Sequence, residues 1–170
     1  METIKTISFT LLLVLGFRFF VAEPRYIPSE SMLPTLQIND RLIIDKLSYK
    51  LIKPERGAVV VFEPTALLKQ QNFKDAMIKR VIGLPGDRVE IKGGRVYINE
   101  QPLRENYIAE KPEYHYGPVE VPSGEYLVLG DNRNHSYDSH DWGFVPRHQI
   151  IGRAAIRFWP LHRFGQLFGS

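Results

Sequence analysis

Short apolar runs, each bounded by glycine, proline or other turn-forming residues, set the strongest limit on how this chain folds. The runs are rich in valine, isoleucine and leucine, which favour strands, and they cover residues 41–47, 58–62, 76–82, 89–92, 95–98, 126–129 and 153–159. Gly93 and Gly94 separate two of the runs and predict a tight hairpin, because glycine tolerates positive φ. No stretch after residue 26 has the pattern of an amphipathic helix. The chain is therefore predicted to be mostly β, as a single β-barrel or coiled sheet.

The length allows one domain with a real core, since the chain has 170 residues. We place this β domain at residues 24–170. About residues 93–125 form a short excursion within it, and the part from 102 to 122, with its four prolines and three tyrosines, is predicted to be irregular.

The N-terminal segment is mostly apolar over residues 6–22, which as a helix would be about 25 Å long at about 1.5 Å per residue. We interpret residues 1–23 as an uncleaved, membrane-spanning anchor. The competing interpretation is a cleavable signal peptide with Lys5 as its charged start. Cleavage after Ala22 would place Phe20 where a small side chain is required. More basic residues follow the segment than precede it, which weakly favours a cytoplasmic domain.

Charge and composition exclude several classes of function. The net charge is +3 without any block of lysine and arginine, so a nucleic-acid partner is not expected. A weakly basic, anchored chain suits anionic lipid headgroups better. The chain has no cysteine, which excludes disulfides, thiolate nucleophiles and cysteine metal sites.

Residues 27–36 hold two serines, Ser29 and Ser31, between Pro28 and Pro34. The prolines discourage regular pairing, so a shaped loop with outward hydroxyl groups is predicted. From the residues alone, a linker between an anchor and a domain is an equally good interpretation.

Lys79 lies inside the apolar run 76–82, and strand alternation places Met77 and Val81 on its face. Burial there would disfavour the ammonium form and lower the pKa of Lys79. The commoner interpretation of a single lysine is one that extends from a half-buried strand to water. Together with Ser31 it indicates catalysis, because a neutral amine can accept the proton of a serine hydroxyl.

Residues 130–143 follow the run 126–129 and are dense in turn-forming and hydrogen-bonding side chains. A polar turn with side-chain-to-backbone bonds explains Asp131 and Asn132. It does not explain why so many donors and acceptors precede the sequence WGFVP.

At these three places the sequence resembles the type I signal peptidases, membrane-bound serine/lysine endopeptidases. PSESMLPTL at residues 28–36 is similar to the nucleophile motif, and residues 39–46 to the strand after it. KRVIGLPGD at residues 79–87 is similar to the lysine motif, and residues 130–143 to the last one. The motifs occur in the family's order over nearly the whole chain.

The resemblance implies a role for each matching residue. Ser31 would be the nucleophile and Lys79 the general base. The Ser29 hydroxyl and the Ser31 backbone N–H would stabilise the oxyanion. Ser136 would hydrogen-bond the lysine amine and orient it. The supporting residues would be Asp131, Arg133, Asp138 and Arg80, and the shallow pockets for small residues at −1 and −3 would involve Ile27, Leu36, Met77 and Ile78.

Three residues depart from the family pattern. His140 stands where arginine is common two residues after Asp138, which implies pH sensitivity in place of a permanent ion pair. Glu30 and Asp141 also depart, and we expect both to face solvent. The spacing of histidines and acids matches no familiar ligand pattern, so neither a metal nor another cofactor is expected.

We therefore expect a membrane-anchored serine endopeptidase that removes signal peptides from exported preproteins after Ala-x-Ala. Its domain would lie on the extracytoplasmic face of the plasma membrane or in the thylakoid lumen, next to the lipid bilayer. The aromatic residues 158–164 would close the fold or contact lipid. The alternative is an anchored β-barrel binding module without catalysis. A self-cleaving repressor would need a DNA-binding domain, for which residues 1–26 leave no room.

Overall fold

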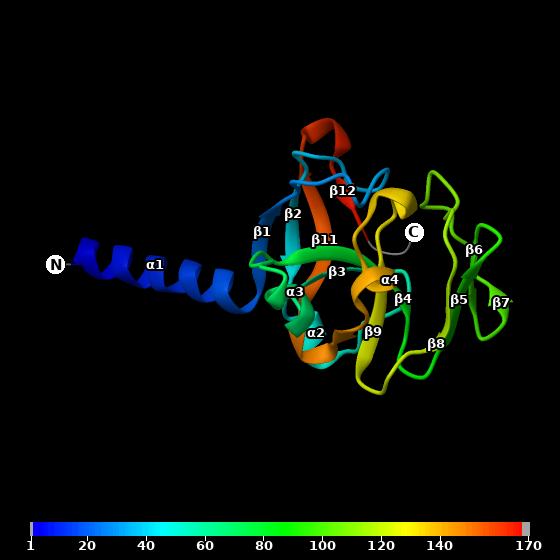
Figure 1. Ribbon diagram of the computed structural model, residues 1–170. Helices are drawn as coiled ribbons and strands as arrows, with labels where there is room; N and C mark the ends of the chain where they lie inside the picture. The colour runs from blue at the N-terminus through cyan, green and yellow to red at the C-terminus, as the bar shows by residue number, and fades with distance from the viewer. Residues whose placement is uncertain (1, 168–170) are drawn as a thin grey trace.

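The computed structural model describes residues 2–167, so the ends of the predicted segments at residues 1 and 168–170 lie outside the described residues. Most of its ordered elements are antiparallel strands (Figure 1). The larger, eight-stranded sheet has the order β1-β2-β11-β3-β4-β9-β10, with β12 paired to β11. Its strands are β1 (Ala22–Tyr26), β2 (Arg41–Asp45), β3 (Val59–Phe62), β4 (Met77–Gly83), β9 (Glu125–Leu129), β10 (Val145–Pro146), β11 (Ile150–Trp159) and β12 (Gly165–Gln166).

The larger sheet is coiled and open. Register shifts interrupt β11 against both β2 and β3, and such bulges bend a strand and increase its twist. Within the described residues, β1 and β10 end the strand order without pairing to each other. The prediction of a mostly-β fold built on a coiled sheet is thus confirmed.

The smaller sheet lies at the end of the molecule opposite α1 (Figure 1). It has the order β7-β6-β5-β8. Its strands are β5 (Arg88–Lys92), β6 (Arg95–Ile98), β7 (Gln101–Pro102) and β8 (Tyr116–Glu120). The predicted hairpin forms, with Gly93 and Gly94 at φ 56° and 72°.

The prediction that residues 102–122 are irregular is wrong for β8. This strand pairs with β5 although Gly117 and Pro118 lie inside it. Both residues are poor strand formers, so the partner strand, and not local propensity, determines this element.

Three apolar clusters form the core, and two of them lie on opposite faces of β3. Val60 and Phe62 belong to the cluster that includes Trp142, whereas Val59 and Val61 belong to the cluster that includes Met32. Both faces are buried, which explains why β3 reads as an uninterrupted apolar run. The third cluster joins the two sheets and consists of Ile82, Val89, Ile91, Val96, Ile98, Val121, Leu127 and Leu129.

Helices are peripheral. The short ones are α2 (Ser48–Leu51), α3 (Ala66–Gln70) and α4 (Ser139–Trp142), and single 3-10 turns are η1 (Arg133–His135), η2 (Arg147–Gln149) and η3 (Leu161–Arg163). α1 (Glu2–Phe20) extends away from the sheets (Figure 1). Its first half carries Lys5, Thr6, Ser8 and Thr10. Among the described residues, no helix combines the length and the apolar character needed to cross a membrane, so the anchor expected over residues 1–23 is not confirmed.

Candidate active site

Ser31 lies in the loop that connects β1 to β2. Met32 and Leu36 are completely buried and anchor this loop in the core. The backbone N–H of Ile27 donates to the carbonyl of Asp40 at 2.9 Å and closes the loop at its base. The loop is therefore rigidly held, and Ser31 is 8% exposed at a defined position.

Lys79 lies on β4, opposite Val60 of β3, in the middle of the larger sheet. Only 4% of the residue is exposed. Its Nζ atom donates a hydrogen bond to Ser31 Oγ at 2.6 Å. Two side chains 48 positions apart in sequence thus meet at hydrogen-bond distance.

The charge of Lys79 is easily lost. Burial lowers the pKa of Lys79 to about 8, although the negative charges of Asp138 and Asp131 oppose this shift. A neutral amine is therefore accessible near physiological pH. In that form the hydrogen bond reverses, and the Ser31 hydroxyl donates to the nitrogen lone pair.

Ser29 and Ser136 lie in different environments. Ser29 is exposed, and its Oγ lies 3.3 Å from Ser31 Oγ. Ser136 Oγ is buried and has no hydrogen-bond partner among the described residues. The predicted bond between Ser136 and the Lys79 amine is therefore not formed, and the Ser136 hydroxyl lies against Gly130 instead.

Arg80 and Asp131 form a buried ion pair next to the two candidate catalytic residues. Their side chains are 1% and 0% exposed. Two parallel bonds join them, from Arg80 Nε to Asp131 Oδ1 at 2.8 Å and from Nη2 to Oδ2 at 2.6 Å. Thr35, on the serine loop, donates to Asp131 Oδ2, so the pair also holds this loop. Such bidentate pairs fix geometry as well as charge.

Asp138 and Arg133 hold the turn after β9 from its two sides. Asp138 Oδ2 accepts from the Gly130 N–H at 2.8 Å, and Arg133 Nε donates to the Gly130 carbonyl at 3.0 Å. Arg133 also makes two bonds to Glu105, at 3.0 and 2.6 Å. All four predicted supporting residues are therefore brought around Ser31 and Lys79.

His140 bonds to Asp138 through Nδ1 at 2.7 Å, at the start of α4. Burial alone would lower the pKa of His140, but the hydrogen bond and negative charge of Asp138, aided by Asp141, raise it overall. Glu30 and Asp141 are exposed, as expected.

Potential metal-ligand atoms of Asp138, His140 and Asp141 lie within 4.8 Å of one another in the described part of the chain. Asp138 already uses both carboxylate oxygens, because Oδ1 bonds to His140 Nδ1 and Oδ2 accepts from the Gly130 N–H. We see no geometry here that requires an ion, and the absence of a metal or cofactor stays a prediction.

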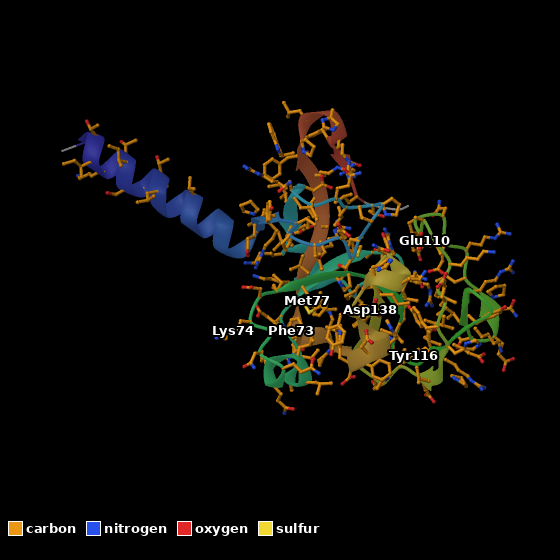
Figure 2. All side chains as sticks on the ribbon, turned by 45° about the horizontal axis from the view of Figure 1, so that its top comes forward. Phe73, Lys74, Met77, Glu110, Tyr116 and Asp138 are labelled. Atoms are coloured by element: carbon orange, nitrogen blue, oxygen red, sulfur yellow. The ribbon has the colours of Figure 1, made fainter. Side chains whose placement is uncertain are left out.

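A pocket of about 380 Å³ opens beside Ser31. Figure 2 shows Phe73, Lys74 and Met77 grouped on one side of Asp138. The lining consists of Pro28, Ser29, Ser31, residues 72–76, Met77, Ile78 and Lys79.

Two of the four predicted pocket residues, Met77 and Ile78, line this space. The other two, Ile27 and Leu36, do not: they are 2% and 0% exposed and pack in the core. The resemblance to the family implied all four residues, and it does not tell which side chains of a loop turn inward.

Sequence reasoning missed three residues of the site. Thr35 and Glu105 contact the predicted charged residues, and Gly130 leaves no space for a side chain. A Cβ on Gly130 would lie 2.4 Å from the Ser31 carbonyl oxygen and 2.2 Å from Ser136 Oγ. A glycine directly after an apolar strand was the one available signal.

Sequence comparisons with known proteins extend over nearly the whole chain. A family model described as "Signal peptidase, peptidase S26" matches residues 1–159. Signal peptidase I of Leptolyngbya laminosa is 63% identical over 98% of this chain and 83% of that protein. A probable thylakoidal processing peptidase 2 of Arabidopsis thaliana is 44% identical over 90% of this chain and 42% of its own length. A signal peptidase I structure from Enterococcus faecalis has a TM-score of 0.52 and 31% identity, covering 61% of this chain and 98% of that one.

Proposed function

We propose, because this chain belongs to the signal peptidase family S26, that it removes signal peptides with Ser31 as nucleophile and Lys79 as general base. One observation carries the assignment of the two residues. A lysine amine that is 4% exposed lies 2.6 Å from a serine hydroxyl beside an open pocket. A polar loop with a merely structural role has no need for a buried amine at that place.

The reaction would proceed in two steps. Lys79 Nζ accepts the Ser31 proton while Oγ attacks the scissile carbonyl carbon, and the resulting ammonium protonates the leaving amine of the mature protein. Water then gives a proton to Lys79 and attacks the acyl-enzyme ester; the ester bond to Ser31 Oγ breaks, Lys79 returns the proton to Oγ, and the signal peptide leaves with a free carboxylate. The Ser29 hydroxyl and the Ser31 N–H would donate to the oxyanion. Asp131, Arg133, Asp138 and Arg80 would support the site without touching the substrate.

The substrate would bind as an added strand along β4. β9 pairs with β4 only over Arg80–Gly83, so within the described residues the same edge of β4 lacks a strand over Met77–Lys79. An extended peptide can bond to that edge, with alternate side chains directed into the pocket. Met77 and Ile78 would then restrict the side chain next to the scissile bond, which supports cleavage after Ala-x-Ala.

We further propose that the domain works next to a bilayer, on the extracytoplasmic face of a plasma membrane or in a thylakoid lumen. The similarity to bacterial and thylakoidal peptidases supports this location. Trp159, Leu161 and Phe164 are 47%, 71% and 66% exposed, and such side chains suit the interface with lipid. The single span over residues 1–23 stays a prediction that the structure does not confirm.

The function is tested with a purified preprotein that ends its signal peptide in Ala-x-Ala. We expect one cut after the second alanine, detected by mass spectrometry of both products. The same preprotein with phenylalanine at −1 should react at least about 100-fold more slowly, because we expect Met77 and Ile78 to leave room for only a small side chain next to the scissile bond. Binding of the preprotein without any cut would instead support the alternative, a binding module.

The dyad predicts the pH dependence of cleavage. Lys79 must be neutral to accept a proton, and its pKa is lowered by burial to about 8. We expect kcat/KM to rise about tenfold per pH unit below this value and to level off above it. Initial rates between about pH 6 and pH 10 measure this limb. A profile that is flat across this range would contradict a lysine base.

A further inference from the structure

The part of the excursion that lies between β7 and β8, residues 103–115, contacts the residues around the site. Glu105 lies on it, and both Glu105 and Arg133 are almost completely buried, with side chains 5% and 0% exposed. Two bonds of 3.0 and 2.6 Å join the carboxylate to the guanidinium, and Tyr107 Oη donates to the same carboxylate at 2.9 Å.

The other end of Arg133 leads to the nucleophile. Its Nε donates to the Gly130 carbonyl, and the N–H of the neighbouring Asn132 donates to the Ser31 carbonyl at 3.1 Å. Glu105 is thus two hydrogen-bonded contacts away from the backbone of Ser31.

Tyr107 supports the lysine side of the site. Its ring lies 4.0 Å from the Arg80 guanidinium carbon, and Arg80 follows Lys79 on β4 and holds Asp131. A desolvated guanidinium over an aromatic ring is among the stronger contacts of this kind. Burial raises the pKa of Tyr107, so it stays a neutral donor to Glu105.

Three further contacts hold the excursion in place. Asn134 accepts from the Glu113 N–H at 2.9 Å and donates to the Lys111 carbonyl at 3.1 Å. The rings of Tyr114 and His140 stack at 4.1 Å. In Figure 2, Glu110 and Tyr116 lie on one side of Asp138, and the pocket residues Phe73, Lys74 and Met77 lie on the other.

We propose that Glu105 and Tyr107 are positioning residues for the cleavage reaction. They fix Arg133 and Arg80, which hold the segment of Gly130 and Asp131 against Ser31 and Lys79. This inference rests on the proposed dyad. The excursion is then a working part of the active site, although its own sequence is irregular and carries no catalytic motif.

The test uses the full chain and compares Glu105→Gln with Glu100→Gln. Glu100 pairs with Arg88 at 3.7 Å, and both side chains are largely exposed. Glu100→Gln therefore removes the same charge from a nearby position with little loss of stability. We expect Glu105→Gln to lower kcat by about 100-fold, as small displacements of catalytic groups do, with KM almost unchanged because Met77 and Ile78 are outside the network. Glu100→Gln should behave as the unmodified protein.

The pH profile separates positioning from simple loss of folded protein. The negative charges of Asp131 and Asp138 raise the pKa of Lys79. If the segment that carries them loosens, this pKa should fall, and the rise of kcat/KM with pH should shift to lower pH. A smaller folded fraction would instead lower the rate at every pH by the same factor, without changing the pH at which kcat/KM rises.

Tyr107 gives a second comparison that leaves the ion pair intact. Tyr107→Phe keeps the ring under Arg80, whereas Tyr107→Leu removes it. We expect the leucine variant to lose about tenfold in kcat and the phenylalanine variant to keep most of it.

The proposal is overturned if folded Glu105→Gln and Tyr107→Leu show the kcat and the pH limb of the unmodified protein. It is also overturned if the rate falls only in proportion to the folded fraction measured by circular dichroism. Ser31→Ala is assayed in parallel: an inactive Ser31→Ala beside normal Glu105 and Tyr107 variants rejects this inference alone, and an active one rejects the dyad itself.

Discussion

Replacing Lys79 by methionine is expected to lower kcat by at least about 10⁴-fold, because Ser31 then has no base to accept its proton. Methionine keeps the length and fills the apolar surroundings of β4, so the fold should survive. Ser31→Ala should lose a similar factor, and the double variant should be no worse than either single one, since the two groups act as a unit. Cleavage of an Ala-x-Ala preprotein by each purified variant measures the effect.

Lys92→Met is the matched control. Lys92 lies on β5 of the smaller sheet and its side chain is 51% exposed, so the same substitution should leave kcat unchanged. Processing by Lys79→Met or Ser31→Ala at a rate near that of the unmodified protein would end the assignment of the dyad.

Asp131→Asn is expected to destabilise the folded protein by about 3–5 kcal/mol. The substitution keeps the size of the side chain but leaves the Arg80 charge buried without its partner, and this arginine is 1% exposed. It also weakens the contact to Thr35 on the serine loop. Urea unfolding followed by circular dichroism measures the free energy of unfolding.

An exposed ion pair provides the comparison for Asp131. Glu90 and Lys92 are 2.7 Å apart on β5, with side chains 27% and 51% exposed, and Glu90→Gln should cost no more than about 1 kcal/mol. Equal, small losses for the two variants would show that the Arg80–Asp131 pair does not stabilise the fold.

Local patterns predicted most of the fold. β3 and the hairpin of β5 and β6 lie where apolar runs and paired glycines placed them. The signals are strong there because side-chain alternation and positive φ are properties of neighbouring residues. β8 was missed because its pairing with β5 outweighs the poor strand propensity of its own residues.

The sequence predicted which residues belong to the site better than it predicted the contacts that they make. Met77 and Ile78 line the pocket, but Ile27 and Leu36 point into the core. Ser136 Oγ is buried without the expected bond to the lysine. Such outcomes depend on how a loop turns, and side chains without a repeating pattern carry no signal for that direction.

The amino-acid pattern alone predicts that the protein is mostly β, that a serine loop precedes a lysine-bearing strand, and that a polar turn follows a later strand. These are short-range properties of composition and spacing. The folded chain was needed to see that Lys79 meets Ser31 across 48 positions, and that Glu105 and Tyr107 contact Arg133 and Arg80. Such contacts arise from the packing of distant segments into one dry interior, where each buried charge requires a partner that no local pattern announces.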